Sequence, residues 1–162
     1  MNPVYHLTRF VFMLLIVLSG CSSSADIASP EGIGEKERVR VVDGSQAART
    51  INRMHNQSVA ADANVIAEYG KEKKDLLYIS YYADPKQAKK ALDLMIEKMT
   101  AAKKGPFFHL MPMNTYTQPV YFTFGMGAMH YIYQSGNYLL WLQTYQSFDD
   151  KLPPGLLKLY PV

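Results

Sequence analysis

The stretch "QPVYFTFGMGAMHYIYQSGNYLLWLQTY", residues 118–145, decides the fold class. Aromatic and β-branched residues dominate it, and such residues fit the pleated, half-buried surface of a sheet. The segments "QPVYFTFG", "AMHYIY" and "YLLWLQTY" predict strands of a meander, and Gly136 and Asn137 suit a tight hairpin turn. The glycines of "GMGAM", residues 125–129, predict a bend or bulge, because a phosphate-binding loop needs a strand-loop-helix setting and a further glycine.

Segments upstream of this stretch predict a hairpin and a long helix. "NVIAEYG" and "DLLYISYYA" are rich in strand formers and flank the charged turn "KEKK", residues 71–74. Asp84 is a good helix cap, and Pro85 suits the first helical position. Apolar residues then repeat at helical spacing up to Gly105, namely Ala88, Leu92, Met95 and Met99.

A strand and a second helix are predicted before this hairpin. "VRVV", residues 39–42, has the composition of a short strand. Asp43 or Ser45 can then cap a helix that runs through Asn56. Three apolar residues share one face of that helix: Ala47, Ile51 and Met54.

The element order predicts an α+β fold. It reads strand, helix, two strands, long helix, then three or four strands in a meander, and the tail from Lys151 forms at most a short helical turn after its prolines. The expected architecture is an antiparallel sheet of about five to six strands with two helices packed on one face. A chain of 162 residues with 48% hydrophobic and 19% charged residues leaves room for one domain, placed at residues 38–162.

The first 20 residues have the pattern of a secretory signal peptide. Arg9 supplies a positive charge, and a nine-residue apolar run from Phe10 to Leu18 ends in the small residues Ser19 and Gly20. A spanning helix needs about 20 apolar residues, so this run is too short for a permanent span. Residues 1–20 are therefore expected to be removed on export.

Residues Leu18, Ser19, Gly20 and Cys21 resemble the lipobox of bacterial lipoproteins, which is a leucine, two small residues and an invariant cysteine. The resemblance implies cleavage between Gly20 and Cys21, and covalent lipid on the Cys21 sulfur, with no other cofactor. It also implies a membrane anchor in the cell envelope. Ser22 is uncharged, which in that family goes with the outer membrane, facing the periplasm, in bacteria that have two membranes.

The segment that follows the lipidated cysteine is predicted to be a flexible tether up to residue 37. "SSSADIASPEGIGEKE", residues 22–37, mixes serine, glycine, proline and charge without an apolar period. Cys21 is the only cysteine of the chain, so the domain holds no internal disulfide. Its core must be stabilised by packing alone.

The segment "FFHLMPMN" suggests a metal site. His109, Met111 and Met113 alternate, so an extended backbone would place them on one face, and thioether and imidazole ligands suit Cu(I). Three further residues could complete such a site: Met126, Met129 and His130. The alternative is that these methionines fill a core.

Aromatic residues and lysines suggest surfaces for binding. Seven rings could line an open face of the sheet: Tyr116, Tyr121, Tyr131, Tyr133, Tyr138, Trp141 and Tyr145. Core packing explains part of this set. Residues 71–104 carry nine lysines against five acids, a charge that could face anionic lipids or cell-wall polymers or could be a solvated helix face.

These features favour a non-catalytic domain that binds an envelope protein or a cell-envelope component. The sole cysteine is assigned to lipid, and no serine lies in a nucleophile turn. Two alternatives stay open: a carrier of a small ligand or of Cu(I) through the Met and His residues, and a hydrolase with an unrecognised site. Nucleic acid is not expected as a partner outside the cytoplasm.

Overall fold

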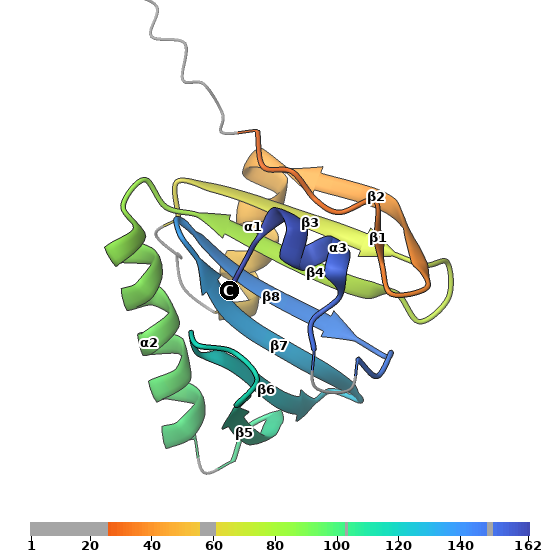
Figure 1. Ribbon diagram of the computed structural model, residues 1–162. Helices are drawn as coiled ribbons and strands as arrows, with labels where there is room; N and C mark the ends of the chain where they lie inside the picture. Colours follow the sequence, from red (N-terminus) through yellow and green to blue (C-terminus); the bar gives the residue numbers. More distant parts are fainter. Residues whose placement is uncertain (1–25, 56–60, 103, 149–150) are drawn as a thin grey trace, which may run out of the picture.

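The computed structural model describes residues 26–55, 61–102, 104–148 and 151–162 (Figure 1). The predicted signal peptide and the lipobox with Gly20 and Cys21 lie outside the described residues. The elements follow in chain order: β1 (Gly32–Ile33), β2 (Lys36–Asp43), α1 (Gly44–His55), β3 (Ala63–Tyr69), β4 (Asp75–Tyr81), α2 (Pro85–Ala101), β5 (Phe107–Pro112), β6 (Val120–Gly125), β7 (Ala128–Ser135), β8 (Tyr138–Thr144) and α3 (Pro154–Leu159).

The strands form one antiparallel sheet in the order β1-β2-β3-β4-β8-β7-β6-β5. The hairpin predicted around "KEKK" is present as β3 and β4, which pair from Ala63–Tyr81 to Tyr69–Asp75. Helix α2 then carries the chain to the far edge of the sheet, and β5 to β8 return as a meander until β8 pairs with β4. The sheet curls, so β5 and β6 turn away from β2 and β3 (Figure 1).

The α+β class is confirmed, whereas the expected number of five to six strands is wrong. The described residues form eight strands and three helices. Strand β1 has two residues, Gly32 and Ile33, inside a segment rich in Gly, Ser and Pro, so it carries no alternating pattern. Strand β5 is interrupted by a shift of register between Phe108 and Met111, and it ends at Pro112.

Two helices cover one face of the sheet, as the apolar repeats predict. Asp84 caps α2 by accepting a hydrogen bond from the Lys86 backbone N–H, and Ala88 and Leu92 are buried. They pack against Ile132 and Leu139, which point to this face. In α1, Ala47 and Ile51 pack on Ile66 of β3. Met54 is more than half exposed, so its predicted place on the buried face of α1 is wrong.

The opposite face is covered by α3 and by residues 26–33, so the prediction that helices lie on one face only is wrong. Ile27, Ile33 and Leu156 join the main core there, together with residues of β3, β4, β6, β7 and β8. Tyr69 Oη donates to the Pro30 carbonyl at 3.0 Å, and Tyr160 Oη donates to the Ala28 carbonyl at 2.5 Å. These contacts hold the segment on the sheet.

This segment corrects the predicted domain boundary at residue 38. Ile33 is fully buried and β2 begins at Lys36, so residues 26–37 belong to the folded domain rather than to a tether. The sequence predicted a tether here because the two isoleucines of the segment are isolated and show no helical or strand periodicity. Among the described residues, no helix is long and apolar enough to cross a membrane.

Candidate binding surface

The predicted aromatic surface divides between the two faces of the sheet. Tyr131 and Tyr133 are buried in the main core, and Tyr133 Oη donates to the Tyr160 carbonyl at 3.2 Å. Burial raises the pKa of the Tyr133 hydroxyl far above its usual range. Tyr116 and Tyr138 pack half-buried against the same core, and the Tyr116 oxygen accepts a hydrogen bond from the Leu152 backbone. These four rings are structural.

The other three predicted rings do not form one exposed surface either. Tyr121 and Trp141 pack half-buried on the opposite face, beneath α2. Only Tyr145 is exposed among the seven, and its ring lies 5.7 Å from Lys36 Nζ. The expectation of an open aromatic face is therefore wrong for all but one residue, because non-local segments cover both faces.

Strand β5 does not provide the regular alternation that a site of His109, Met111 and Met113 needs. His109 has a positive φ of 55° and occupies the bulge between Phe108 and Met111. The bulge adds a residue to β5, so the alternation that the spacing argument needs is interrupted there. His109 and Met111 are exposed, whereas Met113 packs against the main core.

The three further candidate ligands are also separated. His130 is fully buried on the α2 face, where its Nε2 lies 3.0 Å from the Gly125 carbonyl and its Nδ1 accepts from Trp141 Nε1 at 2.9 Å. Met129 packs on the opposite face, and Met126 projects from the turn after β6. No group of three or more His, Cys, Asp or Glu side chains in the described residues could hold a metal ion.

The hydrogen bonds fix the state of His130. A ring that donates from Nε2 and accepts at Nδ1 is the neutral imidazole. Burial lowers the pKa of His130, and the hydrogen bond to the Gly125 carbonyl opposes this shift. Phe107 meets the His130 ring edge-on at 5.1 Å between centroids. The two ring nitrogens therefore link β7 to β6 and β8, and the ring face contacts Phe107 of β5.

A cluster that the sequence did not single out lies at the open end of the meander, on the face of the main core. Its side chains are large, apolar and exposed, and we call them the apolar edge patch: Phe108 (57% exposed), Met111 (48%), Phe124 (36%), Met126 (61%) and Tyr145 (42%). These residues come from β5, β6, the β6–β7 turn and the end of β8. Strands β5 and β6 form the lower part of the molecule, whereas α3 covers the upper part (Figure 1).

The patch borders a hollow of about 320 Å³. The Phe108 and Phe124 rings lie nearly parallel with 6.0 Å between centroids, and Phe122 meets Phe124 edge-on at 4.7 Å. Apolar side chains and glycine backbone line the hollow: Phe108, Phe124, Gly125, Gly127, Ala128, Met129, Thr144 and Tyr145. Such a hollow, at the lower end of the size range of ligand sites, accommodates one or two apolar side chains.

The backbone geometry of the β6–β7 turn places Met126 in solvent. Met126 and Gly127 both have positive φ, as a two-residue type I′ hairpin requires, and the turn aims Met126 outward. A Cβ on Gly125 would lie 2.3 Å from the Phe107 ring, so only glycine lets β5 approach β6 here. The predicted bend at "GMGAM" is thus a tight turn.

A second hollow, of about 560 Å³, lies beside α3 and is lined by Gly34, Phe148, Lys151, Leu152, Pro153, Pro154, Leu157 and Lys158. The chain between Phe148 and Lys151 passes through residues 149–150, which the structure does not describe. Every residue of the apolar edge patch, by contrast, belongs to the described part of the chain.

A buried carboxylate forms the main polar cluster near the patch. Asp75 is fully buried and pairs with Lys36 Nζ at 2.8 Å. It also accepts from Thr144 Oγ1, Gln146 Nε2 and the Tyr145 backbone N–H. Every lone pair is used, so the group ties β2, β4 and β8 together. Its partners lie up to 71 positions away in the sequence. No local sequence pattern could therefore have predicted this cluster.

The lysines of residues 71–104 do not form one surface. The turn between β3 and β4 carries Lys71, Lys73 and Lys74, all exposed, and it projects on the side of the molecule opposite α2 (Figure 1). Lys74 pairs with Glu68 at 2.6 Å, and Lys89 of α2 pairs with Asp93 at 2.7 Å. The segment thus presents two separate basic regions.

No family model, no curated protein and no solved structure matches this chain.

Proposed function

We propose that this chain is a bacterial envelope lipoprotein, held to a membrane by lipid on Cys21, whose α+β domain binds another envelope protein and performs no catalysis. The expected location is the outer membrane, facing the periplasm, where the source has two membranes. The lipobox resemblance of Leu18 to Cys21 supports the anchor. The apolar edge patch supports the binding role.

The observation that carries the binding role is the exposure of five large apolar side chains at the open end of the meander, three of which line one hollow: Phe108, Phe124 and Tyr145. Contiguous exposed apolar surface of this kind marks interaction sites, whereas single exposed apolar residues are ordinary. Phe, Tyr and Met are also the residue types enriched at protein interfaces. The polar clusters of the described residues are structural, because Asp75 and His130 are fully hydrogen-bonded within the fold.

The anchor is tested by labelling growing cells with a fatty acid that carries a clickable group. The wild-type chain should incorporate the label, and Cys21→Ala should abolish the labelling. Ser22→Ala is the matched control, because it changes the neighbouring residue and leaves the thiol intact. Labelling of Cys21→Ala at the wild-type level contradicts the anchor, without bearing on the patch.

A further inference from the structure

Strand β5 provides a backbone edge beside the apolar edge patch. It is the last strand of the sheet and pairs with β6 alone among the strands that the structure describes. A free edge can take an extended peptide as an additional strand, with pockets beside it selecting the side chains. The bulge at His109 and the proline at Pro112 interrupt this edge, so only a short segment can pair with it.

The chain segment that carries strands β5 to β8 has formal charge of one sign. Residues 98–148 contain three lysines and no aspartate or glutamate. Lys98 at the end of α2 and Lys104 just before β5 are both exposed, close in sequence to Phe107. A partner segment with acidic residues beside an apolar side chain would therefore meet complementary charge. Such charge raises the association rate and the selectivity more than it raises the affinity.

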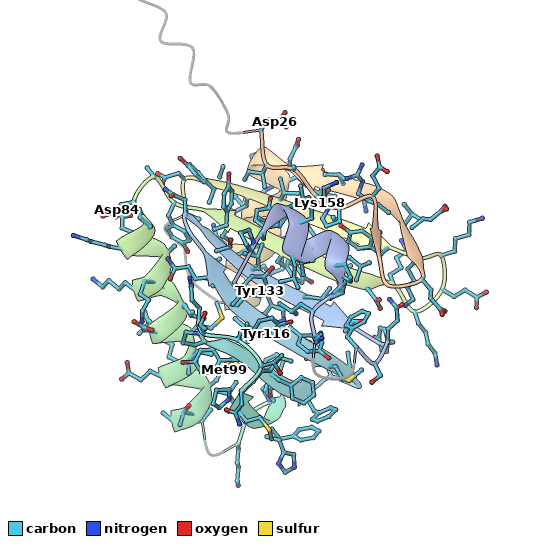
Figure 2. All side chains as sticks on the ribbon, viewed as in Figure 1. Asp26, Asp84, Met99, Tyr116, Tyr133 and Lys158 are labelled. Atoms are coloured by element: carbon cyan, nitrogen blue, oxygen red, sulfur yellow. The ribbon has the colours of Figure 1, made fainter. Side chains whose placement is uncertain are left out.

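The proposed anchor at Cys21 argues against the membrane as the occupant of the patch. The described structure begins at Asp26, five positions after Cys21. Five fully extended steps from Cys21 to Asp26 span at most about 18 Å. Asp26 lies at the upper end of the molecule and strands β5 and β6 at the lower end (Figures 1 and 2). A lipid on Cys21 would therefore keep the upper end within about 18 Å of the membrane, while the patch lies at the opposite end of the domain.

We infer that the apolar edge patch binds a short extended segment of a partner protein, with one apolar anchor side chain in the hollow and acidic residues beside it. The segment lies along β5 and contacts Phe108 and Phe124, while Lys98 and Lys104 attract its carboxylates. The patch faces outward from the anchoring membrane. This inference rests on the proposed function, since the direction of the patch depends on lipid at Cys21.

The test uses the mature chain with Cys21→Ser, so that it is soluble without lipid, and a displayed library of random 12-residue peptides. Selected peptides should carry an apolar residue next to Asp or Glu, in sequences without helical spacing of apolar residues. Phe108→Ser should weaken their binding at least tenfold. Leu94→Ser is the matched control, because Leu94 is also an exposed apolar residue but lies on α2; it should leave binding unchanged.

Two further arms test charge and membrane separately. The double variant with Lys98→Glu and Lys104→Glu should weaken binding several-fold, with a smaller difference at high salt. Vesicles of anionic phospholipid should bind wild type and Phe108→Ser equally.

Several outcomes overturn the inference. One is a library that yields no peptide sensitive to Phe108→Ser. Another is a set of selected peptides without acidic residues, and a third is vesicle binding that requires Phe108. Selected peptides that need Phe108 but carry apolar residues at helical spacing overturn the extended segment alone, and they leave the proposed binding role of the patch in place.

Discussion

The two halves of one face of the sheet both carry large apolar side chains, and they differ in exposure. Beneath α3 and residues 26–33, side chains such as Tyr69, Leu77, Tyr133 and Leu140 are fully buried. Toward β5 and β6, Phe108 and Phe124 point from the same face into solvent. The difference shows that alternation within a strand assigns a side chain to a face, while a distant segment decides whether that face becomes core.

Strand β6 contains this contrast within three residues. Phe122 and Phe124 lie on the same face because they are two positions apart. Phe122 packs against the main core, and Phe124 belongs to the exposed patch. The boundary between the covered half and the open half therefore runs across β6, where the cover given by α3 and the N-terminal segment ends.

Removing the N-terminal segment that covers the sheet should lower the free energy of unfolding more than any other change considered below. A fragment that begins at Arg38 loses the buried Ile27 and Ile33, and it leaves the fully buried Asp75 without Lys36. Deleting one partner of a buried ion pair costs about 3–5 kcal/mol, and each lost isoleucine adds about 2–5 kcal/mol. These losses approach the whole stability of an ordinary domain, about 5–15 kcal/mol. We expect fragment 38–162 to be unfolded at 25 °C.

Urea unfolding followed by circular dichroism measures this effect. The fragment that begins at Asp26 is the control and should unfold in one cooperative transition. If the fragment that begins at Arg38 unfolds at the same urea concentration as the control, the N-terminal segment contributes nothing to the covered half.

The regular parts of the fold could be predicted because their signals are local. The cap at Asp84 with the repeat of Ala88 and Leu92 gives α2, and the glycine turn at Gly136 gives the β7–β8 hairpin, where Gly136 has the positive φ that the turn requires. Strand β1 and the cover formed by residues 26–33 were missed for the opposite reason. Isolated isoleucines become core residues only through contacts with distant parts of the chain.

The candidate surface was predicted only in part for the same reason. Met111, Met126 and Tyr145 were singled out, but as metal ligands or as part of a wide aromatic face. Phe108 and Phe124 were not, because nothing local distinguishes an exposed phenylalanine from a buried one. The bulge at His109 has no signature in the sequence either, since a positive φ outside glycine is uncommon.

Acid should lower the free energy of unfolding through His130, which lies on the α2 face of the sheet. This effect should be smaller than that of the truncation. Because burial lowers the pKa of His130, the unfolded chain takes up a proton before the folded chain does. The free energy of unfolding therefore falls as the pH decreases below the ordinary value of 6.5, and it stops falling below the pKa of the folded state. The slope from one such group reaches at most about 1.4 kcal/mol per pH unit.

The structural cause is that a proton added to His130 must go to Nδ1, which already accepts from Trp141. His130→Gln should remove this part of the pH dependence, because a glutamine amide can still donate and accept without titrating in this range. Urea unfolding between pH 7.5 and pH 5, followed by the fluorescence of the single tryptophan, measures the slope. His109→Gln is the matched control at an exposed ring, and it should keep the wild-type slope. An unchanged slope in His130→Gln would show that other groups set the acid response.

The smallest effect on stability is expected where the patch itself is trimmed. Phe108 and Phe122 are the same residue type on neighbouring strands and the same face, and they differ in whether the main core covers them. Phe122→Ala should lower the free energy of unfolding by about 2–4 kcal/mol, since removing a packed phenylalanine costs about 3–5 kcal/mol when it is fully buried. Phe108→Ala should cost less than about 1 kcal/mol, because a side chain that is 57% exposed has little apolar area to lose.

Urea unfolding of the two variants and the wild type gives both values. Equal losses would mean that Phe108 stabilises the domain as a core residue does, and the patch would then need no partner to account for it. A small loss at Phe108, with a large loss at Phe122, leaves binding as the role for which an exposed ring at this edge is suited.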